Sequence, residues 1–328
     1  MSKKVFNNRR VLTFGEAMAL FVADYPGPLE DVDAFRRRIA GADSNVAIGL
    51  ARLGFAVEWL SRIGADAMGA FIRRTLQSEG VDCRHLQVDP ARQTGMMFKT
   101  RALDGSDPAI EYYRRDSAAS QLSMADAEPV DFEGLAHLHI TGIPPALSES
   151  ARELASGLAT KARNVSASVS FDPNLRPAIW ASETLMRSTL NALAAQADWV
   201  MPGLEEGRIL TGQKTERDIA QYYLDHGVRG VMIKLGAQGS YYRGTVDGRL
   251  EEHWIPGASV ESVVDTVGAG DGFAVGVISA LLEGESIDRA LHRGNQIGAR
   301  AIQVIGDMEG LPSRVELADM SLTDSPAS

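Results

Sequence analysis

Strand-like apolar segments alternate with helix-like segments along most of this chain of 328 residues. Short apolar runs bounded by turn residues indicate strands, and apolar residues three or four positions apart indicate helices. Because strands that alternate with helices form a parallel sheet covered on both faces, we expect an α/β fold. The strands are expected at residues 11–15, 57–63, 136–141, 166–171, 197–201 and 230–234, and the helices at residues 45–53, 70–78 and 148–163.

Two stretches interrupt this alternation, at residues 18–38 and 93–116, where short strand-like pieces follow one another. Examples are the segments 95–99 and 109–113, which contain apolar and aromatic residues typical of strands. We expect both stretches to form a small β lid inserted into the α/β domain. The α/β domain would then comprise residues 1–17, 39–92 and 117–315, and a C-terminal tail residues 316–328.

The charge of the chain excludes some classes of partner. Its formal net charge is −10, so its surface repels nucleic-acid phosphates and anionic lipids. The single cysteine, Cys83, cannot form an intrachain disulfide, and no apolar run reaches the roughly 18 residues of a membrane span. Arg9 and Arg10 precede an apolar stretch as in a twin-arginine export signal, but Glu16 lies inside that stretch. We therefore expect a cytoplasmic protein that binds neither nucleic acid nor membrane.

A glycine-rich segment at residues 265–273 indicates an anion site. Residues 263–264 lead into it as the end of an expected strand, and the apolar run 274–282 leads out of it as a helix. A helix N-terminus presents free backbone N–H groups and the positive end of the helix dipole to an anion. Glycines let the backbone approach such an anion closely. Asp271 in this position would serve either as a general base or as a helix cap.

The chain here resembles the ribokinase-like (PfkB) carbohydrate kinases. Residues 265–271, Asp-Thr-Val-Gly-Ala-Gly-Asp, resemble the C-terminal motif of that family, and residues 40–47, Ala-Gly-Ala-Asp-Ser-Asn-Val-Ala, resemble its N-terminal motif. The resemblance extends from about residue 11 to about residue 312. It implies a ribokinase-like three-layer α/β sandwich with a mostly parallel central sheet and a small β lid.

The resemblance also implies how the glycine-rich segment works. Asp271 would be the catalytic base that accepts the proton of the acceptor hydroxyl. The backbone N–H groups of Gly268, Ala269, Gly270 and Asp271 would form an anion hole for the phosphoryl group in transfer. The family uses ATP with Mg²⁺, and many members also bind a monovalent cation such as K⁺ at a position that Asp265 matches.

The nucleotide is expected along the same edge of the sheet. Residues 234–239, Lys-Leu-Gly-Ala-Gln-Gly, are similar to the strand and turn that lie against ATP in the family. Asn295 matches a residue that lines the adenine pocket, and Asn174 is either a nucleotide contact or a turn residue. The nucleotide site would comprise Asn174, Lys234, Gly236, Gly239 and Asn295.

One departure from the family concerns the metal. The family often has Asn-x-x-Glu near the phosphates, and the corresponding residues here are Gly203, Leu204, Glu205 and Glu206. Glu206 keeps the acid, which would act indirectly on Mg²⁺, whereas Gly203 lacks the amide. The chain contains no Gly-x-x-x-x-Gly-Lys-Ser/Thr segment, so it is not a P-loop kinase.

Two arginines indicate the kind of acceptor. Arg114 follows Tyr112 and Tyr113 in the expected lid, and Arg176 follows an expected strand end at Asp172. Because a guanidinium binds a carboxylate through paired hydrogen bonds, two arginines in one cleft favour a sugar acid. Each arginine could instead be solvated or ion-paired at the surface.

The same residues are similar to those of 2-keto-3-deoxygluconate kinases. By that resemblance the tyrosine and the two arginines hold the sugar acid, and Gly41 and Asn45 hold sugar hydroxyls. Met97 stands where those kinases often have a tyrosine. The substrate site would comprise Gly41, Asn45, Tyr112, Arg114, Arg176, Asp271 and Asp307.

We therefore predict an ATP-dependent kinase that phosphorylates 2-keto-3-deoxygluconate at its C6 hydroxyl. A fructokinase or another neutral-sugar kinase is the nearest alternative, because residues 172–176, Asp-Pro-Asn-Leu-Arg, also resemble fructokinases. A non-catalytic sugar sensor on the same fold is a remoter alternative. Because an exposed lid sheet often pairs with that of a second copy, we expect a homo-oligomer, a dimer or higher.

Overall fold

The computed structural model describes residues 9–101, 108–264 and 267–323. Within these residues, nine strands form one sheet in the order β13-β12-β11-β10-β9-β8-β1-β4-β5. Neighbouring strands from β5 to β11 are parallel, whereas β12 pairs antiparallel with β11 and β13. The strands are β1 (Arg10–Phe14), β4 (Ala56–Gly64), β5 (Leu86–Asp89), β8 (Leu135–Thr141), β9 (Ser168–Asp172), β10 (Trp199–Val200), β11 (Gly230–Lys234), β12 (Ser240–Val246) and β13 (Arg249–Ile255).

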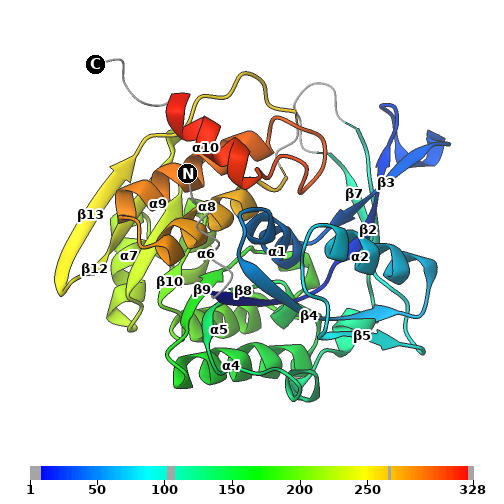
Figure 1. Ribbon diagram of the computed structural model, residues 1–328, viewed down its shortest axis with the longest axis horizontal. Helices are drawn as coiled ribbons and strands as arrows, with labels where there is room; N and C mark the ends of the chain where they lie inside the picture. Colours follow the sequence, from blue (N-terminus) through cyan, green and yellow to red (C-terminus); the bar gives the residue numbers. More distant parts are fainter. Residues whose placement is uncertain (1–8, 102–107, 265–266, 324–328) are drawn as a thin grey trace.

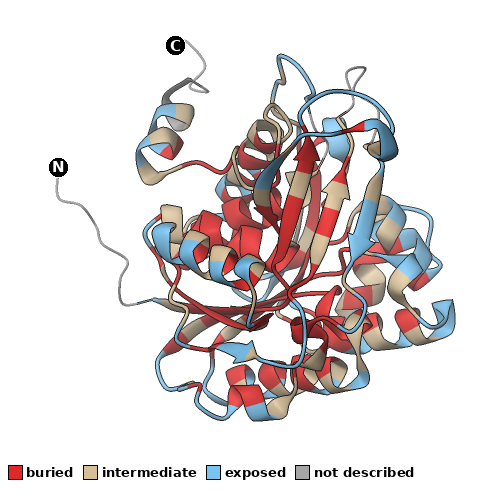
Figure 2. Ribbon diagram, turned by 90° about the vertical axis from the view of Figure 1, so that its right-hand side faces the viewer, coloured by how far each residue is buried: buried red, intermediate tan, exposed pale blue. Residues whose placement is uncertain are grey.

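Helices cover both faces of this sheet, which confirms the expected α/β sandwich (Figure 1). The strands are largely buried between the two helical layers, and the outer helix faces are exposed (Figure 2). One face carries α4 (Glu149–Asn164), α5 (Glu183–Ala194), α6 (Leu204–Thr211) and α7 (Glu216–Asp225), with the short α3 (Pro144–Leu147) preceding α4. The other face carries α1 (Ala42–Arg52), α2 (Ala67–Ser78), α8 (Ala269–Glu283), α9 (Ile287–Ala301) and α10 (Arg314–Thr323).

Helix α8 is buried along most of its length because it packs between α1, α9 and the sheet. Glycines allow this close approach. A Cβ atom on Gly49 of α1 would lie 2.5 Å from Val275 Cγ2, and one on Gly276 would lie 2.6 Å from the backbone of Gly294 in α9. The N-termini of α1 and α8 are consequently held next to each other, which places the two sequence motifs side by side.

Four described strands form a second, smaller sheet in the order β3-β2-β6-β7. They are β2 (Met18–Ala23), β3 (Phe35–Ala40), β6 (Met96–Lys99) and β7 (Ile110–Tyr113). This sheet projects from the α/β domain beside α2 (Figure 1) and comes from the two stretches that were expected to form a lid. β3 runs to Ala40, past the expected boundary. β2 and β6 are parallel, so the lid sheet is mixed.

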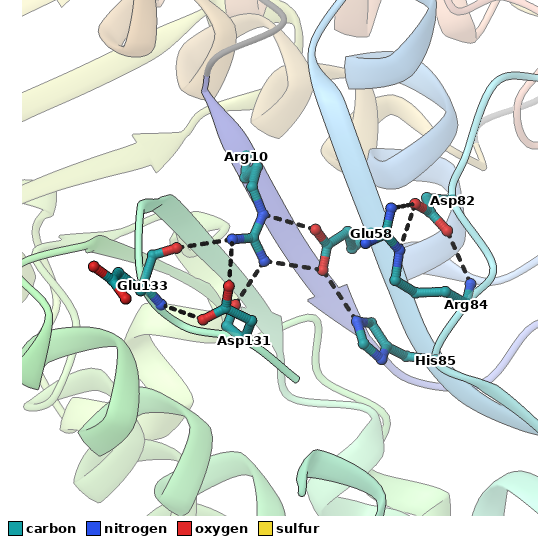
Figure 3. Close-up of polar contacts among 7 residues, drawn as sticks. All are labelled: Arg10, Glu58, Asp82, Arg84, His85, Asp131 and Glu133. Carbon is teal, nitrogen blue, oxygen red and sulfur yellow. Dashed lines mark hydrogen bonds and ion pairs between the residues drawn. The ribbon is translucent and has the colours of Figure 1, made fainter. Parts of the chain in front are cut away.

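A buried polar cluster lies near the N-terminal ends of β1 and β4 (Figure 3). The carboxylate of Glu58 lies between Arg10 and His85, and its side chain is 6% exposed. Arg10 Nε donates to Glu58 Oε1 at 2.8 Å, and His85 Nε2 lies 3.1 Å from Glu58 Oε2. Arg10 also donates to the backbone oxygens of Asp131 and Glu133. These bonds tie β1 and β4 to the loop that precedes β8.

One local expectation was wrong. Residues 256–264 contain no strand, and Val263 and Val264 are exposed. The chain therefore enters the glycine-rich segment from a loop, because these two valines find no neighbouring strand to pair with. No helix in the described part of the chain has the length and apolar character needed to cross a bilayer.

Candidate active site

The N-terminus of α8 forms an anion-binding turn. Gly268 caps the helix with φ of 86°, a left-handed conformation that favours glycine. A Cβ atom at this position would lie 2.6 Å from the backbone oxygen of Asp307, so the close packing of the two loops also requires glycine. The helix begins at Ala269, so the first-turn N–H groups and the positive helix end lie at one point. An anion would be stabilised there.

Asp271 lies in the first turn of α8 and is 7% exposed. Asn45 Nδ2 donates to its Oδ2 at 2.8 Å, and Asn174 Nδ2 donates to its Oδ1 at 3.4 Å. Burial raises the pKa of Asp271, and the hydrogen bond from Asn45 and the charges of Lys234 and Arg176 oppose that rise. A carboxylate held in place with a raised pKa is suited to accept a proton from a hydroxyl.

Lys234 and Asp172 form a buried ion pair beside this turn. Lys234 ends β11 and Asp172 ends β9, and Lys234 Nζ lies 2.7 Å from Asp172 Oδ2. Burial raises the pKa of Asp172 to about 6, against the effect of Lys234. Burial disfavours the charged form of Lys234, but the charges of Asp172 and Glu206 outweigh burial and raise its pKa. The ammonium group of Lys234 lies next to Gly270, at the anion-binding turn.

A cleft of about 600 Å³ opens between the lid and the C-terminal ends of the strands. The lid contributes Tyr112 and Met97, and the α/β domain contributes the anion-binding turn and Asp271. The lining includes Gly41, Asn45, Met97, Tyr112, Arg114, Asn174, Arg176, Gly203, Glu206, Lys234, Gly236, Gly268, Gly270, Asp271 and Asp307. The cleft thus combines two arginines with the carboxylate that can act as base.

A second cavity, of about 540 Å³, lies on the other side of the turn. Small and apolar residues such as Ala237, Val260 and Ile302 line much of it, together with Gly239 and Asn295. The two cavities share Lys234, Gly236 and Gly270. A ligand whose flat apolar ring lies in the second cavity could therefore reach the anion-binding turn with a phosphate chain that passes Lys234.

Comparison with known proteins identifies the family to which a chain with this site belongs. The sequence pattern of the pfkB family carbohydrate kinases matches residues 8–314. The chain belongs to this family. A 2-dehydro-3-deoxygluconokinase of Bacillus subtilis (strain 168) is 48% identical over 94% of this chain and 94% of its own length. A fructokinase of Escherichia coli is 35% identical over 84% of this chain and 90% of its own length.

Solved structures of carbohydrate kinases have the same fold. A PfkB protein from Polaromonas sp. JS666 superimposes with a TM-score of 0.86 at 48% identity, over 94% of this chain and 99% of that one. A putative ribokinase II from E. coli in complex with ATP and Mg²⁺ has a TM-score of 0.86 at 27% identity, over 96% of this chain and 99% of that one. These likenesses confirm the expected ribokinase-like fold, and the family membership confirms a phosphotransferase that acts on a sugar hydroxyl.

In this kinase, the residues expected at the acceptor line the first cleft, together with all residues expected at the anion hole except Ala269. Ala269, Gly239 and Asn295 lie in the second cavity, the expected nucleotide site. Asn174 was also expected at the nucleotide, but it lines the acceptor cleft and contacts Asp271. Asp265, expected to bind a monovalent cation, lies outside the described residues.

Glu206 occupies a position that fits an indirect role at Mg²⁺. Its Oε2 accepts from the Gly203 N–H at 2.6 Å and its Oε1 from the Leu175 N–H at 2.7 Å, so both oxygens already have backbone partners. No group of three acidic, histidine or cysteine side chains suited to a metal occurs among the described residues. Mg²⁺ bound with ATP usually keeps several waters and takes only one or two carboxylates from the protein. Glu206 beside the anion-binding turn is therefore compatible with such an ion.

Sequence reasoning missed Glu16, which contacts Arg114 in the same region. Its Oε2 lies 2.6 Å from Arg114 Nη2, and its side chain is 1% exposed. In the sequence, Glu16 stood out only as a charge inside an apolar stretch. That charge was the available signal, because a charged residue inside a strand-like segment requires a buried partner.

Proposed function

We propose that this protein is a 2-keto-3-deoxygluconate kinase that transfers the terminal phosphoryl group of ATP to the C6 hydroxyl. The observation that carries the proposal is that Arg114 and Arg176 line the same cleft as Asp271. Two guanidinium groups can hold the carboxylate of a sugar acid at one end while its far hydroxyl reaches the base. The 48% identity to a 2-dehydro-3-deoxygluconokinase supports the same substrate.

Each group then has a chemical task. Asp271 accepts the hydroxyl proton as the hydroxyl oxygen bonds to phosphorus and the bond to ADP breaks. The N–H groups of Gly268, Ala269, Gly270 and Asp271 bind the phosphoryl oxygens. Lys234 lines both cavities, so its ammonium group would contact the phosphate chain that joins them. Mg²⁺ would neutralise the phosphate charge, and Glu206 would help to hold it indirectly. Closure of the lid would exclude water that hydrolyses ATP.

Further parts of the proposal concern the surroundings of the site. Tyr112, Gly41 and Asn45 would contact the sugar acid, and Asp307 would lie beside it. ATP as co-substrate and a single cysteine support a cytoplasmic location. Activation by K⁺ beside Asp265 and assembly as a homodimer through the lid remain proposals, which K⁺ titration and light scattering of the purified protein would test.

A coupled ADP-release assay with Mg²⁺-ATP and K⁺ tests the function. The acceptors are 2-keto-3-deoxygluconate, its galacto epimer, fructose, ribose and adenosine. We expect kcat/KM for the sugar acids to exceed that for fructose and ribose by at least about 100-fold, because a site built for a carboxylate strongly rejects an acceptor that lacks it. A preference for fructose would favour the second candidate, a fructokinase, which the 35% identical relative supports. No turnover with any acceptor would support the sensor alternative.

A further inference from the structure

Glu16 is a buried charge in the connection between β1 and β2. Its side chain is 1% exposed, and a carboxylate that deep in a protein must be paired and hydrogen-bonded to be tolerated. Oε2 lies 2.6 Å from Nη2 of Arg114, and Oε1 accepts a hydrogen bond from the Ser117 hydroxyl. Both partners follow β7, at the point where the chain leaves the lid. Glu16 therefore links the first lid connection to the last one.

The other two lid connections also meet Glu16. A Cβ atom on Gly95, just before β6, would lie 2.6 Å from Glu16 Oε1, and one on Gly41, just after β3, would lie 2.4 Å from the Glu16 backbone oxygen. Glycine at both positions lets the chain pass against this residue. The described connections between lid and α/β domain are residues 15–17, residue 41, residues 90–95 and residues 114–117. All of them converge on Glu16, three on its side chain or own backbone and residue 41 on its backbone oxygen.

This arrangement leaves Arg114 oriented but incompletely bonded. Arg114 lines the acceptor cleft, although its side chain is only 9% exposed. A guanidinium carries five N–H donors, and its contact with Glu16 is an ion pair that uses none of them in a hydrogen bond. Arg114 Nε and Nη2 are both buried, and neither forms a hydrogen bond with any residue in the described part of the chain. An arginine fixed before binding loses less side-chain entropy when a ligand arrives.

We propose that Glu16 is a positioning residue that fixes Arg114 toward the acceptor cleft and so sets the affinity for an acceptor carboxylate. The inference rests on the proposed function, because it requires that Arg114 binds a sugar acid. Glu16 acts through Arg114 and does not touch the acceptor. A contrasting possibility is that Glu16 only holds the lid connections together, in which case its loss would impair every acceptor and ATP alike.

The Glu16→Gln variant separates these roles. Glutamine keeps the size of the side chain and can still accept from Ser117, but it loses the charge that holds Arg114. We expect KM for 2-keto-3-deoxygluconate to rise at least about tenfold, with kcat and KM for ATP within about twofold of the wild type. Glu16→Asp keeps the charge but is one methylene shorter, so it should also raise KM for 2-keto-3-deoxygluconate. This variant replaces Glu16→Gln in the test if the glutamine variant does not fold.

Glu58→Gln is the matched control. Glu58 is another buried glutamate paired with an arginine (Figure 3), but it lies near the N-terminal end of β4 and does not line the acceptor cleft. This substitution should lower the melting temperature and leave KM for the sugar acid unchanged. It thereby measures what the loss of any buried glutamate–arginine pair does to the enzyme.

A double-mutant cycle with Arg114→Ala tests the route of the effect. If Glu16 acts through Arg114, Glu16→Gln should have no further effect on KM once Arg114 is alanine. Additive effects on KM would overturn the proposal. An unchanged KM for the sugar acid in both Glu16 variants would also overturn it, as would an equal rise in KM for ATP. If the wild-type protein does not phosphorylate sugar acids at all, the proposed function fails first and the inference falls with it. Wild-type turnover with unaffected Glu16 variants refutes only the role of Glu16.

Discussion

Replacement of Asp271 by asparagine should abolish turnover while leaving the fold intact. The asparagine side chain keeps the shape of aspartate but cannot accept a proton at neutral pH. Loss of a general base lowers kcat by about 10²–10⁴-fold. We expect the upper end of that range, because the other carboxylates that line the cleft are engaged. Glu206 accepts two backbone N–H groups, and Asp307 lies 3.8 Å from the ammonium group of Lys99.

The stability of Asp271→Asn gives an independent check. Burial raises the pKa of Asp271 in the folded protein, so folding becomes less favourable as pH rises from the ordinary carboxyl pKa through the raised one. At pH 7 the wild type carries this penalty, and the neutral asparagine does not. We expect the variant to melt at the same temperature as the wild type or higher at pH 7, with the difference disappearing near pH 3.

Two measurements on the same preparation decide the matter. The coupled ADP-release assay gives kcat, and isothermal titration calorimetry gives the affinity for ATP, which should stay within about threefold of the wild-type value. For the wild type, kcat/KM should fall at acid pH with a midpoint above the ordinary carboxyl range. Turnover of Asp271→Asn within about tenfold of the wild type would refute the assignment of the base. Weak ATP binding by a folded variant would show that Asp271 organises the nucleotide site instead.

Three further predictions follow from the same geometry. Arg114→Ala should raise KM for the sugar acid at least about tenfold more than KM for any neutral sugar, and equal effects in the acceptor assay would remove the carboxylate assignment. Gly268→Ala should lose about 1–3 kcal/mol of stability and most of kcat, because φ is 86° and its Cβ would meet the Asp307 backbone; Gly284→Ala, with φ of 81° and open space, should lose stability only. Glu58→Ala should cost about 3 kcal/mol in urea unfolding without changing kcat, because it removes the buried carboxylate that both Arg10 and His85 contact.

Strands of the sheet could be predicted where the local apolar pattern alone defines both ends of the strand. The segment 230–234 is bounded by glycine on one side and by a turn on the other, and β11 has these bounds. Residues 263–264 are equally apolar but exposed and not part of a strand, because strand formation needs a neighbouring strand that local sequence does not specify. The lid could be located because its short apolar and aromatic pieces break the helix–strand alternation.

The site was only partly predictable, because its polar contacts join residues far apart in the chain. The two glycine motifs locate the N-termini of α1 and α8, but they do not reveal that Asn45 donates to Asp271. Asn45 was expected to bind the sugar, and Asn174 to bind the nucleotide. Both also lie within hydrogen-bond distance of the carboxylate of Asp271, which neither motif indicates.

These contacts also explain why the base can work at neutral pH. Burial alone would favour the protonated form of Asp271, which cannot accept a proton from a hydroxyl. Asn45 on α1, Asn174 after β9 and Lys234 at the end of β11 each stabilise the ionised form. The α/β fold brings these elements together at one edge of the sheet, and the close packing of α1 on α8 sets the 2.8 Å bond from Asn45. The reactivity of Asp271 therefore depends on the tertiary fold as much as on the glycine-rich segment that contains it.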